Sequence, residues 1–99
     1  MPANQTSAPE TLAMLRSAFP AGVAEPEYLP LLSLLVTRMS YRAMANVIAQ
    51  LTGRDFSTAY HDALKVDALL RESHHFEGID ALIGRLNPHG YQQWLQADE

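Results

Sequence analysis

Apolar residues recur along this chain at the three- and four-residue steps of amphipathic helices, and no segment shows the two-residue alternation of a half-buried strand. The first predicted helix carries on its apolar side Ala8, Leu12, Leu15 and Phe19. Ser7 and Glu10 form the pattern of a capping box at its start. Pro20 and Gly22 are expected to end it, because proline disfavours helical geometry in the preceding residue and glycine tolerates positive φ.

The second predicted helix is apolar almost all the way round. Most of its circumference is covered by Leu31, Leu32, Leu34, Leu35 and Val36. We expect it to start near Glu27 or Tyr28, with Pro30 in its first turn, where a missing N–H costs nothing, and to end around residues 38–39. A helix without a polar face has to lie inside the fold, so this segment is predicted to form the centre of the core.

Two longer helices are predicted next. Ser40 is a good N-cap for the third helix, and Gly53 has the position of its C-cap. The apolar stripe of this helix consists of Tyr41, Met44, Ala45, Ile48 and Leu51. Asp55 or Ser57 is expected to cap the fourth helix. Its apolar face consists of Phe56, Ala59, Ala63, Val66 and Leu70, widened by Tyr60 and Leu64.

The last third of the chain predicts a fifth helix and a helical turn. The sequence at 73–75 breaks the periodicity, and a fifth helix then runs from about Phe76 to the Asn-Pro-His-Gly stretch at 87–90. Tyr91, Trp94 and Leu95 share a face that should fold back over the core. The fold class is therefore all-α, a compact bundle of about five short helices with a C-terminal helical turn. We expect one helical domain over residues 7–96, with disordered ends at 1–6 and 97–99.

The segments just described resemble a small actinobacterial family of all-helical proteins known only as a domain of unknown function. The matching residues are Leu15-Arg16-x-x-Phe19-Pro20-x-Gly22-Val23 and Tyr28-x-Pro30-Leu31-Leu32-x-Leu34-Leu35, followed by the helix opening at Ser40. The family's usual Leu-Pro step and Gly-Trp-Pro-Leu ending are replaced here by the sequences at 73–75 and 90–92. The resemblance implies a domain of four to five helices and about this length. It implies no activity and provides no functional residues.

Composition narrows the class of protein. The 99 residues suit a single domain, and 47% hydrophobic with 18% charged residues is typical of a folded chain. The absence of cysteine excludes disulfides, thiolate nucleophiles and cysteine-based metal sites. The net charge of −4 argues against anionic membranes and nucleic acids as partners. We find no signal-peptide pattern at the N-terminus and no apolar run long enough to span a bilayer, and we expect a cytoplasmic protein.

Catalytic and metal sites have little support in the sequence. The residues that could suggest zinc are His61, His74, His75 and His89, with Glu72 and Glu77 nearby. A structural zinc site needs four converging ligands, and adjacent histidines point in different directions. Neither phosphate-binding glycine motifs nor a nucleophile elbow is present. We therefore predict no enzymatic activity and no cofactor.

Nucleic-acid binding is the sharpest alternative. Residues 40–49 resemble the first helix of a helix-turn-helix motif, and the second helix would begin at Phe56. The positive groups on this reading are Arg42, Arg54, His61 and Lys65. The spacing differs from the usual motif, because Gly53 follows Ala45 by eight residues where about four are expected. Specific binding also needs several phosphate contacts from lysine or arginine, which the second helix does not supply.

These observations favour a small non-enzymatic module that binds another protein or itself through a helix face. Tyr91, Trp94 and the Phe19-Pro20 corner with Val23 are candidate contact residues, although aromatic residues at these places more often close the end of a small core. We expect any binding surface to lie on the third and fourth helices or in the divergent tail. A clustering of positive side chains on one face would favour nucleic acid instead.

Overall fold

Six α-helices and one 3₁₀ turn follow one another in the computed structural model, which describes residues 8–96. They are α1 (Ala8–Ala18), α2 (Glu25–Leu35), α3 (Tyr41–Thr52), α4 (Phe56–Arg71), α5 (Ile79–Leu86), the turn η1 (Asn87–His89) and α6 (Tyr91–Gln96). This part of the chain contains no strand, and the prediction of an all-α bundle is confirmed. The capping role of Ser7 and the expected disorder of residues 1–6 and 97–99 lie outside the described residues. Within 8–96, no helix combines the length and the apolar character that a membrane crossing demands.

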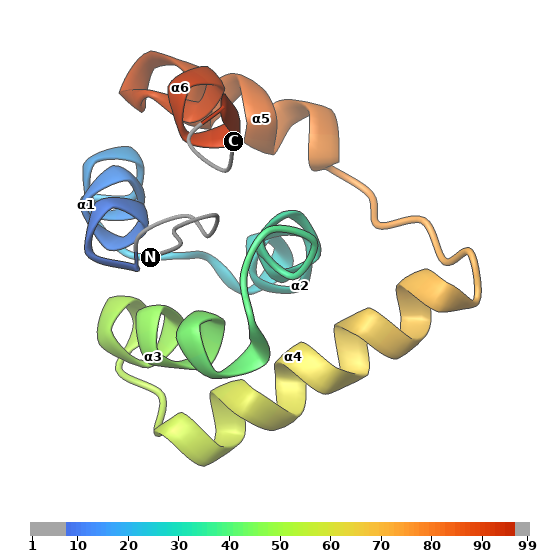
Figure 1. Cartoon of the computed structure of the whole chain (residues 1–99). Helices are drawn as coiled ribbons and strands as arrows, with labels where there is room; N and C mark the ends of the chain where they lie inside the picture. Colours follow the sequence, from blue (N-terminus) through green and yellow to red (C-terminus); the bar gives the residue numbers. More distant parts are fainter. Residues whose placement is uncertain (1–7, 97–99) are drawn as a thin grey trace.

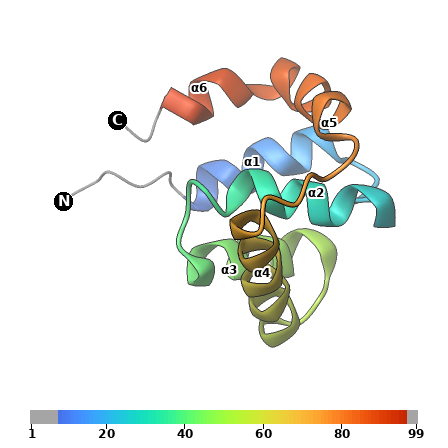
Figure 2. The same ribbon diagram turned by 90° about the vertical axis from the view of Figure 1, so that its right-hand side faces the viewer.

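The helices form three layers. In Figures 1 and 2, α1 and α2 lie in the middle, α3 and α4 cover one side of them, and α5, η1 and α6 cover the other side. The packing follows this arrangement, since α1 contacts α3 and η1, while α2 contacts α4 and α5. Leu31 and Leu32 of α2 have no exposed surface. The prediction that the second helix forms the centre of the core is therefore confirmed.

The ends of α2 differ from the prediction. The helix begins at Glu25, so Pro26 occupies its first turn and Pro30 lies in its interior. The start is fixed by a capping contact, in which the Ala24 N–H donates to the Glu27 carboxylate at 3.1 Å. Pro30 remains close to this end, where its missing N–H removes a single hydrogen bond of the ladder. The helix ends at Leu35, three to four residues earlier than expected, and turns of the backbone carry the chain to α3.

The caps of the next two helices are as predicted. The Ser40 hydroxyl accepts from the Ala43 N–H at the start of α3, and Gly53 closes this helix with φ of 81°. Asp55, rather than Ser57, caps α4 by accepting from the Thr58 N–H. The fifth helix starts at Ile79 instead of Phe76, because Gly78 adopts a left-handed conformation that a helix interior excludes.

The C-terminal helix α6 is held against α1 by a buried hydrogen bond. The Trp94 Nε1–H donates to the Thr11 hydroxyl at 2.7 Å, and both side chains are buried. Tyr91 stacks on Trp94 with their ring centroids 5.7 Å apart, and each is only 5% exposed. These two aromatic residues therefore close the core as the predicted tail should, and they offer little surface to a partner.

A second polar link joins α5 to the corner between α1 and α2. Arg85 donates from Nε to the Ala18 carbonyl at 2.9 Å and from a terminal nitrogen to Glu27 at 2.8 Å. Its guanidinium also lies 4.4 Å from the centre of the Phe19 ring. Phe19 is 2% exposed and belongs to the core, whereas Pro20 is exposed and Val23 is half-buried, so only part of the candidate corner reaches the surface.

We expect Thr11→Val to lower the free energy of unfolding by roughly 1–3 kcal/mol, because the buried indole N–H of Trp94 loses its acceptor while the side-chain volume is kept. Urea denaturation followed by circular dichroism measures this change. The matched control is Thr37→Val, which alters an exposed threonine and should change the free energy by less than about 0.5 kcal/mol. Equal effects of the two substitutions would contradict a special role for the Thr11–Trp94 bond.

Candidate functional site

A surface groove lies between the first half of α3 and the start of α4. It has a volume of about 600 Å³ and is lined by Ser40, Arg42, Ala43, Asn46, Phe56 and Tyr60. We call this feature the α3–α4 groove. Its walls combine two aromatic side chains, one guanidinium and short polar groups. Aromatic residues and arginine are the types enriched at protein–protein interfaces.

Two helix caps put these residues in place. Ser40 starts α3, so Arg42 and Asn46 lie one helical turn apart on its outer side, and both are exposed. Asp55 starts α4 by accepting from both the N–H and the hydroxyl of Thr58. These bonds lower the pKa of the Asp55 carboxyl below its usual range. Phe56 is thereby fixed as the first residue of α4, where its side chain lines the groove opposite α3.

Exposure at Phe56 and Leu64 corrects the sequence prediction, which placed both on the buried face of this helix. Phe56 is 44% exposed and Leu64 is 38% exposed, the two large apolar side chains of the described residues that stand out in this way. The core side of α4 consists of Ala59, Ala63 and Val66. At 100° per residue, Leu64 lies about 130° away from the centre of that side. The exposure of Leu64 could thus be predicted from its angular position on the helix. The exposure of Phe56 could not, because it depends on contacts between α3 and α4.

Three aromatic rings form a series that leads from the helix interface into the groove. Tyr41 of α3 meets Tyr60 edge to face with a centroid distance of 6.1 Å, and Phe56 follows Tyr60 at 5.9 Å. Such contacts add about 0.5–1.5 kcal/mol each beyond the buried area. Phe56, the last ring, is held by Tyr60 and still presents much of its surface to solvent.

The inner end of this series is anchored by charge. The Tyr41 hydroxyl donates to Asp67 of α4, and Asp67 also accepts from Arg71 at 3.0 Å. The hydrogen bond from Tyr41, with help from the Arg71 guanidinium, lowers the pKa of the Asp67 carboxyl. The same bond to Asp67 raises the pKa of Tyr41, and the carboxylate raises the pKa of Arg71. The contact locks the aromatic series to both helices.

Two polar groups of the groove have no partner among residues 8–96. Arg42 makes no ion pair or hydrogen bond with its side chain, and the Tyr60 hydroxyl makes no hydrogen bond there. By contrast, the Asn46 carbonyl accepts from Gln50, and the Ser40 hydroxyl accepts from the start of α3. The groove therefore offers a free cation and a free hydroxyl beside an exposed phenyl ring.

The four residues of the nucleic-acid hypothesis do not share one surface. Arg42 lies in the α3–α4 groove, while Arg54 and Lys65 line a separate depression of about 530 Å³ together with Glu25 and Asp62. Arg54 pairs with Glu25 at 3.0 Å and lies 3.8 Å over the Tyr28 ring. His61 is exposed on α4. The structure thus brings Arg54 and Lys65 together, in the company of two carboxylates.

A buried phenol forms the floor of this second depression. The Tyr28 hydroxyl donates to Asp62 of α4 at 2.7 Å. Burial, followed by the hydrogen bond and charge of Asp62, raises the pKa of Tyr28 far above its usual range. The group stays a neutral donor that fastens α4 to α2, and Asp62 is engaged in the same contact.

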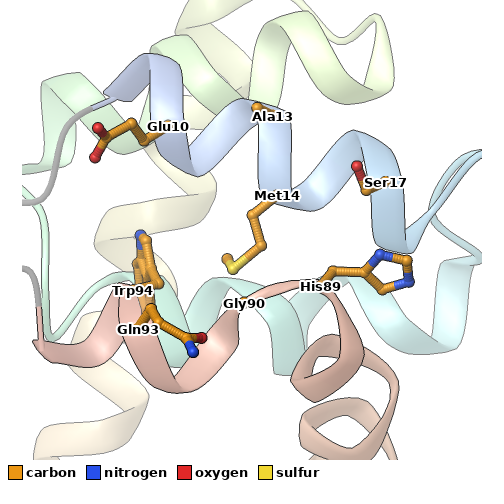
Figure 3. Close-up of a pocket in the computed structure, with 8 residues that line it drawn as sticks. All are labelled: Glu10, Ala13, Met14, Ser17, His89, Gly90, Gln93 and Trp94. Carbon is orange, nitrogen blue, oxygen red and sulfur yellow. The ribbon is translucent and has the colours of Figure 1, made fainter.

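A third depression lies between α1 and the η1–α6 segment (Figure 3). Its volume is about 480 Å³, and its floor is made by Met14 and Trp94, with Glu10, Ser17, His89 and Gln93 around it. Met14 and Trp94 are only 7% and 5% exposed. Its two large apolar side chains belong to the core, whereas the α3–α4 groove presents the exposed Phe56.

Histidines and acidic residues within 8–96 form no group of three that could hold a metal ion. His74 lies edge-on to Phe76 with a centroid distance of 4.5 Å, in the loop that precedes α5.

Comparison with known proteins gives no match to a protein-family model, to a curated protein or to a solved structure. The resemblance to the actinobacterial all-helical family therefore stays a prediction.

We expect Tyr41→Phe to lower the free energy of unfolding at neutral pH, because Asp67 loses the hydroxyl that stabilises its ionised form. A carboxyl with a lowered pKa contributes stability above its ordinary pKa of 3.8, and loses it as the pH falls through the folded-state value. The difference between the wild type and the variant should thus shrink below about pH 3.8. Urea denaturation at neutral and acidic pH measures it. Tyr60→Phe is the matched control and should show no such pH dependence.

Proposed function

We propose that this protein is a non-enzymatic helical interaction module that binds another protein through the α3–α4 groove. The observation that carries the proposal is the exposed Phe56 ring in a groove that also offers Arg42 and the Tyr60 hydroxyl, both without a polar partner among residues 8–96. Buried aromatic anchors and arginines supply most of the binding energy in protein interfaces. A cytoplasmic location belongs to the same proposal and rests on the sequence features described above.

The groove suits a partner better than it suits a small substrate. Its lining holds no acid, histidine or other group that could transfer a proton near neutral pH. The apolar surface continues beyond it, since the exposed Phe56, the half-buried Tyr60 and the exposed Leu64 follow one another at four-residue spacing along α4. A row of this kind matches the length of a peptide or a helix laid along α4.

Nucleic-acid binding through Arg42, Arg54, His61 and Lys65 is the alternative proposal. One observation favours it: α3 and α4 are joined by the three-residue turn 53–55, which contains a glycine, as in helix-turn-helix proteins. Two observations argue against nucleic-acid binding. Arg54 is engaged in an ion pair, and carboxylates lie beside Lys65. The interaction module is therefore the leading proposal.

We expect Phe56→Ala to abolish binding of the partner while the fold is kept, because the side chain is 44% exposed and its loss leaves no cavity in the core. The measurement is affinity capture from the native cell extract with wild type and variant, followed by mass spectrometry. Circular dichroism monitors the fold. The matched control is Gln93→Ala on α6, which should retain every partner. A set of captured proteins that is identical for wild type and Phe56→Ala would contradict the proposal.

Electrophoretic mobility of labelled duplex DNA separates the two proposals. We expect no shift even at low ionic strength, where phosphate contacts are strongest. A shift that disappears in the double variant Arg42→Ala, Lys65→Ala would support nucleic-acid binding and contradict the interaction module.

A further inference from the structure

The partner's chemistry can be inferred from the charges around the α3–α4 groove. We infer that the groove binds an acidic amphipathic helix of another protein, with apolar residues on Phe56, Tyr60 and Leu64 and a carboxylate on Arg42. This inference rests on the proposed function and names the class of partner.

The first step concerns the cation. Arg42 is the one charged residue that lines the groove, and it is exposed and unpaired among the described residues. The other arginines of α4 and of the turn before it are engaged, Arg71 with Asp67 and Arg54 with Glu25. A guanidinium free beside an apolar surface is suited to a carboxylate, which it can bind with two parallel hydrogen bonds.

The second step concerns the acids of this region. Asp55 accepts from Thr58 at the start of α4, Asp62 accepts from Tyr28, and Asp67 accepts from Tyr41 and Arg71. Each carboxylate is thus engaged within the fold, and none of them lines the groove. Although the chain carries a net charge of −4, the one charge on the groove lining is the positive Arg42. An acidic partner is favoured there and a basic one is not.

The third step concerns shape. Phe56, Tyr60 and Leu64 advance by one helical turn at a time, and this row, exposed at Phe56 and Leu64 and half-buried at Tyr60, runs from the groove to the outer side of α4. An amphipathic helix presents apolar side chains at the same repeat, so two such rows can pack against each other over several turns. The Tyr60 hydroxyl lines the groove and can donate a hydrogen bond to a polar group of the partner.

Selection from a displayed library of random peptides tests the inference. We expect wild-type protein to enrich peptides that combine apolar residues at three- and four-residue steps with an excess of aspartate and glutamate. Synthetic copies of the enriched peptides are then measured by fluorescence anisotropy. Arg42→Glu should weaken their binding by roughly tenfold, because a like charge replaces an attractive one. The same variant, used for a new selection, should enrich lysine and arginine. The matched control is Arg16→Glu on α1. Arg16 is an exposed arginine that does not line the groove, so this variant should leave the affinity unchanged.

The outcomes separate this inference from the proposal on which it rests. Peptides that need Phe56 but are neutral or basic, or that bind Arg42→Glu as well as wild type, would overturn the acidic partner and leave the interaction module standing. Enrichment that is the same for wild type and Phe56→Ala, or no enrichment, would overturn both. Sedimentation equilibrium gives a further arm, since a dimer that Phe56→Ala dissociates would make a second copy of this chain the occupant and overturn the acidic helix.

Discussion

The requirement that α2 be covered on every side determines the arrangement of the other helices. Its leucines leave no face for water, so a single neighbouring layer would not bury it. Two layers cover it, with α3 and α4 on one side and the α5–α6 segment on the other. Each outer layer is then fastened to the middle by a polar contact, Tyr28 with Asp62 on one side and Arg85 with the α1–α2 corner on the other. Apolar burial supplies the driving force, and these contacts select one arrangement.

The proposed site follows from the same layering. Helix α4 buries only the side that carries Ala59, Ala63 and Val66, so Phe56 at its start and Leu64 on its outer side remain exposed. Phe56 occupies the first turn, and the Asp67–Tyr41 contact keeps the neighbouring rings in place. The proposed surface thus lies where internal packing ends, supported by contacts that belong to the core.

Much of this fold could be read from the sequence because caps and periodicity are local signals. Ser40, Gly53 and Asp55 each act through bonds within three or four residues, and their roles were predictable. The start of α2 could not be predicted, because a start just before Pro30 was equally plausible. The contact between Ala24 and Glu27 fixes the observed start. The groove could be predicted only in part. The angle of Leu64 around the helix axis places it outside the buried face. The exposure of Phe56 and the lack of partners for Arg42 among residues 8–96 depend instead on contacts between helices.

The hydrogen bond between Thr11 and Trp94 joins positions 83 residues apart. Contacts of such separation require closure of nearly the whole chain, which is slow in comparison with the formation of local turns. During synthesis, α1 emerges before the other described helices but completes its packing only after residue 94 has left the ribosome. Until then, α1 can hold α3 on one side while its other side stays open. Helix α1 is therefore made before the other described helices and is among the last of them to be finished.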